Sequence, residues 1–180
     1  MKILHNISLK NYNTFGIDVT AKRFISVDSV YDLQQLLKTE KDIFLISGGS
    51  NMLLTTDIKK LVVHINIKGI SIDREGNNDI CLTVNAGENW HDFVLWCVNL
   101  NYGGLENLSL IPGNVGTCPI QNIGAYGVEV KDVIIENQNP LESITMKLQG
   151  FKFDGGSFLR YRKNIFALFR SIITNFIFIN

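Results

Sequence analysis

The chain has 180 residues, 46% of them hydrophobic, which is enough to bury a core and predicts a single domain with room for two lobes. Seventeen basic residues balance seventeen acidic residues, so the formal net charge is zero. A surface that binds a nucleic-acid backbone needs an excess of basic side chains. We therefore expect no nucleic-acid partner.

Neither end of the sequence predicts export or membrane insertion. Polar residues interrupt residues 1–13, which argues against a signal peptide, and Arg170 interrupts the apolar stretch 165–180, which is too short to span a bilayer. The three cysteines are odd in number and lack the spacing of a disulfide framework or a zinc site. We expect free thiols, a cytoplasmic location, no metal and no membrane partner.

Two helices and several strands are expected along the chain. Apolar residues at helical spacing after Ser29, as far as Lys38, predict a first helix, and Trp90 and Phe93 lie on one face of a second over residues 89–99. Strand-like runs occupy residues 43–46, 61–67, 80–84, 130–135, 141–148 and 172–179, with a turn at 137–140. This order predicts the α+β class.

Residues 103–127, called here the 103–127 loop, hold six of the fifteen glycines and two of the three prolines. Apolar residues distributed along the loop argue against disorder, and a packed loop of this length is usually functional. Gly113, Gly116 and Gly124 lack the Cβ that would keep a ligand away from backbone N–H groups. This composition predicts a loop that binds a dinucleotide cofactor.

A second glycine-rich segment, Ser-Gly-Gly-Ser-Asn at residues 47–51, directly follows a predicted buried strand and is called here the 47–51 turn. Its N–H groups and two hydroxyls suit a pyrophosphate. The segment has neither the Gly-Lys-Ser/Thr of a Walker A loop nor the spacing of a Rossmann turn. Taken alone it is more typical of a surface turn, and its weight comes from pairing with the 103–127 loop.

The remaining candidates favour structural roles. His64, on a polar strand face, and His91, in the first turn of a helix, are expected to be solvated rather than catalytic. Cys118 has no base nearby in the sequence and is expected to pack as a small residue. We expect Trp90 and Trp96 in the core.

Four segments in order resemble one family: NTFGI at 13–17, SGGSNMLL at 47–54, AGENWHDFV at 86–94 and GLENLSLIPGNVGTCPIQNIGAYG at 104–127. They are similar to the UDP-N-acetylenolpyruvoylglucosamine reductases of peptidoglycan synthesis. The resemblance implies the FAD-binding fold of vanillyl-alcohol oxidase-type (PCMH) flavoproteins, with lobes of roughly 1–68 and 69–180. It also implies FAD as cofactor, NADPH as reducing co-substrate, a UDP-sugar substrate and a monomer.

The same resemblance assigns site residues by position. Those implied for the cofactor are Gly48, Gly49, Ser50, Asn51, Met52, Ile111, Pro112, Gly113, Gly116, Thr117, Ile120, Ile123 and Gly124. Tyr126 and Tyr161 are implied on the substrate side. Arg162 is the implied catalytic residue, because a guanidinium fork can stabilise negative charge that builds in the carboxylate of an enolpyruvyl ether.

The resemblance also implies that the family's C-terminal substrate-binding domain, with its proton-donating serine and its glutamate, is absent from this sequence. Two alternatives to the reductase therefore stay open. One is a non-catalytic FAD-binding fragment of such an enzyme. The other is a different flavin oxidoreductase on the same fold.

Overall fold

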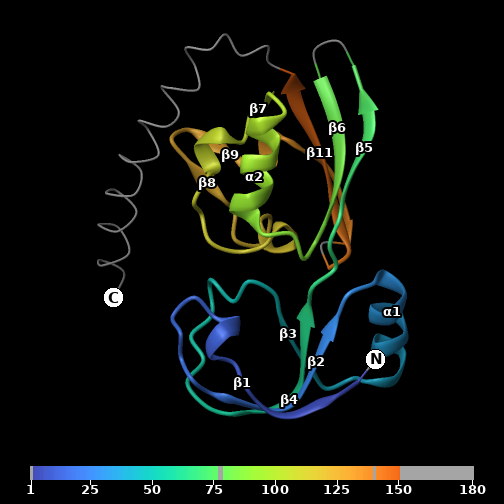
Figure 1. Cartoon of the computed structure of the whole chain (residues 1–180), viewed down its shortest axis with the longest axis vertical. Helices are drawn as coiled ribbons and strands as arrows, with labels where there is room; N and C mark the ends of the chain where they lie inside the picture. The colour runs from blue at the N-terminus through green and yellow to red at the C-terminus, as the bar shows by residue number, and fades with distance from the viewer. Residues whose placement is uncertain (1, 77–78, 140, 151–180) are drawn as a thin grey trace.

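The computed structural model describes residues 2–76, 79–139 and 141–150, which form two lobes, each built on its own β-sheet (Figure 1). The strands of the first sheet lie in the order β1 (Leu4–Ser8), β2 (Thr20–Val27), β4 (Ile58–Ile65) and β3 (Ile43–Ile46). The second sheet has the order β10 (Ile134–Asn139), β11 (Ser143–Gly150), β6 (Asp79–Asn85) and β5 (Ile70–Glu75), with β7 (Tyr102–Gly103) also paired to β11. Strands and helices thus mix in both lobes.

The first sheet is covered on both faces, which explains the apolar sequence of its central strand. β2 and β3 pair parallel to β4, whose residues Leu61, Val62 and Val63 are all fully buried. A strand buried on both faces is expected to be continuously apolar. Helix α1 (Val30–Thr39) covers one face, and the 3₁₀ helix η1 (Lys10–Tyr12) with its flanking loops covers the other.

The second lobe packs helix α2 (Trp90–Asn99) against its antiparallel sheet. The Asn89 side chain accepts a hydrogen bond from the Asp92 N–H and caps the helix, as Ser29 caps α1. Trp90 and Phe93 are fully buried against β6 and β11. Neither this helix nor any other in the described part of the chain has the length and apolar character needed to cross a membrane.

Short elements complete the second lobe. The 3₁₀ helices η2 (Glu106–Leu108), η3 (Val115–Thr117) and η4 (Val130–Asp132) follow α2, and β8 (Gly124–Ala125) pairs with β9 (Val128–Glu129) in a small hairpin. η2, η3 and β8 all belong to the 103–127 loop, which is therefore structured along much of its length. Its residues Leu105, Leu108 and Val115 are fully buried.

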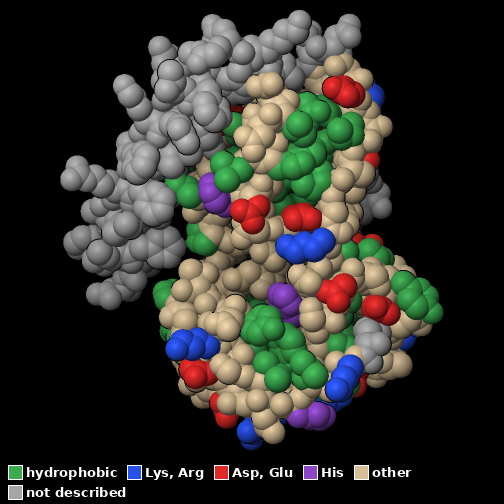
Figure 2. Space-filling view, in the orientation of Figure 1, with side chains coloured by type: hydrophobic (Ala, Val, Ile, Leu, Met, Phe, Trp, Pro, Cys, Tyr) green, Lys and Arg blue, Asp and Glu red, His purple; other side chains and the backbone are tan. Residues whose placement is uncertain are grey.

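The lobes join at residues 66–69 and 85–87. The Gly87 N–H donates to the Ile67 carbonyl at 2.9 Å, and a Cβ on Gly87 would lie 2.6 Å from the Ile67 nitrogen. Lys68 adds a hydrogen bond from Nζ to the Gly87 carbonyl. Figure 2 shows a narrower, hollowed region at this level, with acidic and basic side chains interspersed on the face in view.

The sequence predictions for both helices and for the strands at 43–46, 61–67, 80–84 and 141–148 are confirmed. The single strand predicted over 130–135 is wrong: Glu129 and Asp132 form a capping box that starts η4, and β10 begins only at Ile134. The turn predicted at 137–140 is also displaced, because β10 continues to Asn139. The strand predicted over 172–179 lies outside the described residues.

His64 is half-buried in the first lobe rather than solvated. Its ring lies 5.0 Å from the Tyr12 ring and 6.2 Å from the Phe24 ring, and its Nδ1 is 3.2 Å from the Ser26 hydroxyl. Burial lowers the pKa of His64 from its ordinary value of 6.5, and the carboxylate of Asp28 opposes that shift. The folded protein therefore favours the neutral imidazole.

We expect His64 to make stability depend on pH. The pKa of His64 in the folded protein lies below 6.5, so as the pH falls the unfolded chain takes up the proton before the folded protein does. The free energy of unfolding is therefore retained above about pH 6.5 and declines below it. His64→Gln keeps a group that can hydrogen-bond Ser26 but cannot titrate there. Urea unfolding at about pH 7.5 and about pH 5.5 should show a smaller loss in the variant, and equal losses would contradict this reading.

Candidate functional site

The 47–51 turn follows β3 at the carboxyl edge of the parallel strands. Contacts of Gly49 with residues 12–14, at the end of η1, fix its conformation. Gly49 has a φ of +58°, and its carbonyl accepts a hydrogen bond from the Thr14 N–H at 3.1 Å. A Cβ on Gly49 would lie 2.0 Å from the Tyr12 carbonyl oxygen. Residues 12–14 therefore form the floor on which the turn is built, and only glycine fits there.

The 103–127 loop lies along residues 86–91, which lead into α2. The Trp90 Nε1–H donates to the Leu108 carbonyl at 2.7 Å, and the Trp90 N–H donates to the Gly113 carbonyl at 3.0 Å. The N–H of Gly116 donates to the Ala86 carbonyl at 3.0 Å. The Gly116 N–H is thus hydrogen-bonded within the protein, whereas the sequence led us to expect it to be free to bind a ligand.

The two glycine segments meet, and their glycines are needed for that contact. A Cβ on Gly48 would lie 2.8 Å from the Gly113 Cα, and a Cβ on Gly113 would lie 2.9 Å from the Ser50 hydroxyl oxygen. The Gln121 Nε2 donates to the Ser50 hydroxyl at 2.9 Å and lies 3.4 Å from the Thr117 hydroxyl. This amide therefore bridges the two lobes at their contact.

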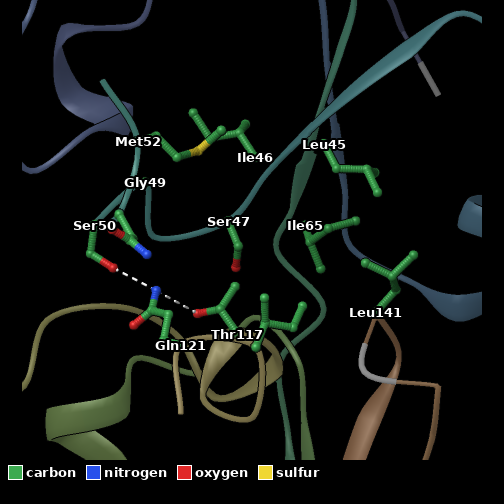
Figure 3. A pocket seen from close by; sticks show the side chains of 12 residues that line it. Leu45, Ile46, Ser47, Gly49, Ser50, Met52, Ile65, Thr117, Gln121 and Leu141 are labelled. Carbon is green, nitrogen blue, oxygen red and sulfur yellow. Dashed lines mark hydrogen bonds between the residues drawn. The ribbon is translucent and has the colours of Figure 1, made fainter. Parts of the chain in front are cut away.

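A cavity of about 240 Å³ lies where the turn, the loop and the strand ends meet (Figure 3). Its lining combines hydroxyl, amide and aliphatic side chains: Leu45, Ile46, Ser47, Gly49, Ser50, Asn51, Met52, Ile65, Thr117, Ile120, Gln121 and Leu141. In Figure 3 the Ser47 hydroxyl points toward the Thr117 side, whereas Leu45, Ile65 and Leu141 gather at the other end. One end is thus polar and the other apolar.

The polar end has hydrogen-bond donors to spare. The Ser47 hydroxyl is buried and finds no partner among the described residues. Within that same part of the chain, the backbone N–H groups of residues 48–51 donate to no acceptor. Buried polar groups are normally paired, so an orphaned hydroxyl beside four free donors indicates a site for a ligand rich in acceptors.

The residues present fit a dinucleotide. Phosphate oxygens match the free donors, and an aromatic base matches the aliphatic end of the cavity. The volume is below the roughly 300–1,000 Å³ typical of pockets for drug-sized ligands, so the cavity suits one part of a dinucleotide. Among the described residues, no cluster of three or more metal-ligating side chains occurs.

The structure brings together some of the predicted site residues and separates others. Gly49, Ser50, Asn51, Met52, Thr117 and Ile120 line the cavity. Ile123 is buried in the core of the second lobe, and Ile111 packs against that core. Gly124 lies in β8, and Tyr126, 60% exposed, lies at the tip of the β8–β9 hairpin. Tyr161 and Arg162 lie outside the described residues.

The cavity is also lined by Ser47, Gln121 and the aliphatic Leu45, Ile46, Ile65 and Leu141, none of which is among the cofactor residues that the resemblance implies. Ser47 had two signals in the sequence: its place directly after a buried strand, and its hydroxyl, one of the two in the 47–51 turn that suit a pyrophosphate. Cys118 was read correctly as a packing residue: it is fully buried, and burial raises its pKa to about 12, so it is a thiol at neutral pH. Trp90 is fully buried, and Trp96 packs partly buried against the same core.

This fold, with a turn rich in free donors facing a long packed loop, defines a dinucleotide-binding domain. The family model described as "FAD binding domain" matches residues 21–147, and the chain belongs to that family. The α+β class with the PCMH-type fold is confirmed.

Named relatives refine this class. The chain is 52% identical over 168 residues to the UDP-N-acetylenolpyruvoylglucosamine reductase of Flavobacterium johnsoniae and 46% identical over 170 residues to that of Amoebophilus asiaticus. Each match covers 92% of this chain, and the chain spans about half the length of these relatives, 49% and 50%. The family resemblance expected from the sequence is confirmed.

A solved structure agrees in fold. The crystal structure of UDP-N-acetylenolpyruvylglucosamine reductase from Thermus caldophilus superposes with a TM-score of 0.67 at 20% identity. The match covers 93% of this chain and 69% of that chain. At this identity the comparison establishes the fold.

Proposed function

We propose that the cavity binds the pyrophosphate and adenosine part of FAD. The observation that carries this proposal is the buried, unpartnered hydroxyl of Ser47 beside the free N–H groups of residues 48–51. These groups would donate to the pyrophosphate oxygens, and the adenine would lie at the aliphatic end near Ile65 and Leu141. Membership of the FAD-binding family supports this choice of dinucleotide.

The 103–127 loop would hold the flavin part, and the two lobes, 1–68 and 69–180, would form one FAD-binding domain. The residues proposed for this role are Ile111, Pro112, Gly113, Gly116, Thr117, Ile120, Ile123 and Gly124. When bound, FAD supplies hydride transfer. The protein's part is to bind and orient the cofactor, and the loop's attachment to residues 86–91 supports a rigid seat for it.

Ser47→Ala tests the proposal because it should weaken FAD binding without lowering the stability of the FAD-free protein. Without FAD, removing an unpaired buried hydroxyl should leave the free energy of unfolding unchanged or raise it by up to about 1 kcal/mol. With FAD, the lost donor should weaken binding roughly tenfold. Urea unfolding and FAD fluorescence titration measure the two effects.

Ser71→Ala is the matched control, since Ser71 lies exposed on β5, far along the chain from both glycine segments. Its FAD affinity should equal that of the unaltered chain. If Ser47→Ala destabilises the FAD-free protein and leaves the affinity unchanged, Ser47 is a structural residue and the proposed site is wrong.

We infer further that the chain serves NADPH-dependent reduction of UDP-N-acetylenolpyruvoylglucosamine to UDP-N-acetylmuramate. The names of the relatives support this substrate. Arg162 would be catalytic, and Tyr126 and Tyr161 would contact the substrate. The exposure of Tyr126 at a hairpin tip leaves its ring accessible to a ligand. The product would feed peptidoglycan synthesis in the cytoplasm, and so cell-wall biogenesis, shape and division, and the chain would act as a monomer.

Turnover is tested with the whole 180-residue chain loaded with FAD. Oxidation of NADPH that depends on the UDP-sugar supports the reductase. Bound FAD without such turnover supports the non-catalytic alternative for this chain, and oxygen consumption without NADPH supports another flavin oxidoreductase. The half-length match to the relatives is the observation that favours keeping the non-catalytic alternative.

A further inference from the structure

The His91 side chain, in the first turn of α2, contacts the 103–127 loop at Ser109 and Leu110, which have no part in the proposed FAD site. Its Nδ1 lies 2.9 Å from the Ser109 hydroxyl oxygen and accepts a hydrogen bond from the Leu110 N–H at 3.2 Å. Ser109 is 1% exposed, so this contact reaches into the protein. His91 was expected to be solvated, and the structure instead places it in a partly buried polar contact.

The backbone that His91 holds is strained. Leu110 has a φ of +66°, a conformation that residues with a Cβ rarely adopt. The other non-glycine residues with positive φ among the described residues are Tyr126 and three asparagines, Asn6, Asn101 and Asn122. Asparagine tolerates this region through its short polar side chain, whereas leucine has no such compensation. Strained backbone persists where surrounding contacts over-determine it, and such positions concentrate at ligand sites.

The hydrogen bond fixes the chemical state of the ring. A backbone N–H can only donate, so Nδ1 must carry a lone pair, and the imidazole is neutral with its proton on Nε2. Within the described residues, His91 is the only acceptor for the Leu110 N–H. Loss of this acceptor would leave a partly buried donor unpaired.

His91 completes a row of contacts from the start of α2. Trp90 holds the loop before this point through the Leu108 carbonyl and after it through the Gly113 carbonyl. His91 holds Leu110 between them. Residues 111–113 follow directly, and Gly113 is the residue that meets the 47–51 turn.

We propose that His91 is a positioning residue: its neutral Nδ1 fixes the strained backbone at Leu110 and thereby sets the path of residues 111–113 toward the cofactor. The effect on the cofactor rests on the proposed function. The effect on the loop does not rest on that function, so the role of His91 in the loop and its role in cofactor binding can be tested separately.

Two substitutions separate hydrogen bonding from packing. In His91→Asn an amide oxygen on Cγ takes the place of Nδ1 and can accept from Leu110, whereas His91→Leu has a similar shape without an acceptor. In the FAD-free 180-residue chain, hydrogen exchange of the Leu110 amide should rise at least roughly tenfold in His91→Leu and stay near the original rate in His91→Asn. Amides in the middle of α2 should keep their protection in both, which controls for unfolding.

FAD binding is the second measurement on the same proteins. His91→Leu should weaken FAD binding roughly tenfold and change the visible circular dichroism of the bound flavin, with both properties restored in His91→Asn. Unchanged exchange at Leu110 in His91→Leu would overturn the proposal. Faster exchange at Leu110 with unchanged FAD affinity would overturn the proposed effect of His91 on the cofactor. If the original chain does not bind FAD, the proposed function is wrong, and the exchange result still decides the role of His91 in the loop.

Discussion

Gly49→Ala is expected to destabilise the protein by roughly 2–5 kcal/mol and to abolish measurable FAD binding. Two costs combine at this position. A methyl group would lie 2.0 Å from the Tyr12 carbonyl oxygen, which is backbone and cannot rotate away, and the φ of +58° disfavours any residue with a Cβ. The turn must therefore move away from residues 12–14, which displaces its free N–H groups from their positions beside the cavity.

Gly16→Ala is the matched control for this substitution. Gly16 has a φ of +64°, but a Cβ there would meet nothing within 4 Å. It should therefore show the conformational cost alone, about 1 kcal/mol, with FAD affinity retained. Urea unfolding and FAD titration of both variants give the comparison, and similar losses in the two would show that the contact with Tyr12 is unimportant.

Asn13→Ala should produce the second large effect, a loss of roughly 2–4 kcal/mol in the free energy of unfolding. Asn13 is 7% exposed, and its side chain makes three hydrogen bonds: Nδ2 donates to the carbonyls of Leu9 and Ile17, and Oδ1 accepts from the Ile17 N–H. Alanine leaves all three backbone groups without this partner. Because Asn13 shapes the floor beneath Gly49, FAD affinity should also fall.

Asn99→Ala gives the baseline for an asparagine that is exposed, here near the end of α2. Its free energy of unfolding should change by no more than about 0.5 kcal/mol. A thermal or urea comparison in which Asn13→Ala is as mild as Asn99→Ala would contradict the assigned role of the Asn13 hydrogen bonds.

Both helices could be predicted from the sequence because a capping residue and an apolar face are set by residues close together in the chain. Ser29 and Asn89 mark the first turns of α1 and α2. The strands β1, β2 and β5 were missed for physical reasons: β5 is exposed over most of its length and carries charges, and Lys22 and Arg23 break the apolar pattern of β2. Their pairing with partner strands (β1 with β2, β2 also with β4, and β5 with β6), rather than their own sequence, makes them strands.

The site was predictable in outline and not in detail. The glycines of the 47–51 turn and the 103–127 loop were recognised as unusual, but their contact with one another is a long-range feature. Gly48 and Gly113 therefore serve loop packing as well as any ligand. The unpaired state of the Ser47 hydroxyl and the bridging position of Gln121 exist only once the two lobes are folded together.

The most direct measurement of the central claim compares FAD with FMN in binding to the 180-residue chain. The cavity beside the 47–51 turn is assigned to the pyrophosphate and adenosine part of FAD, of which FMN keeps one phosphate and lacks the second phosphate and the adenosine. FAD should therefore bind more than roughly tenfold more tightly than FMN, and ADP should compete with it. Equal affinity for FAD and FMN, or no binding of FAD at all, would contradict the assignment.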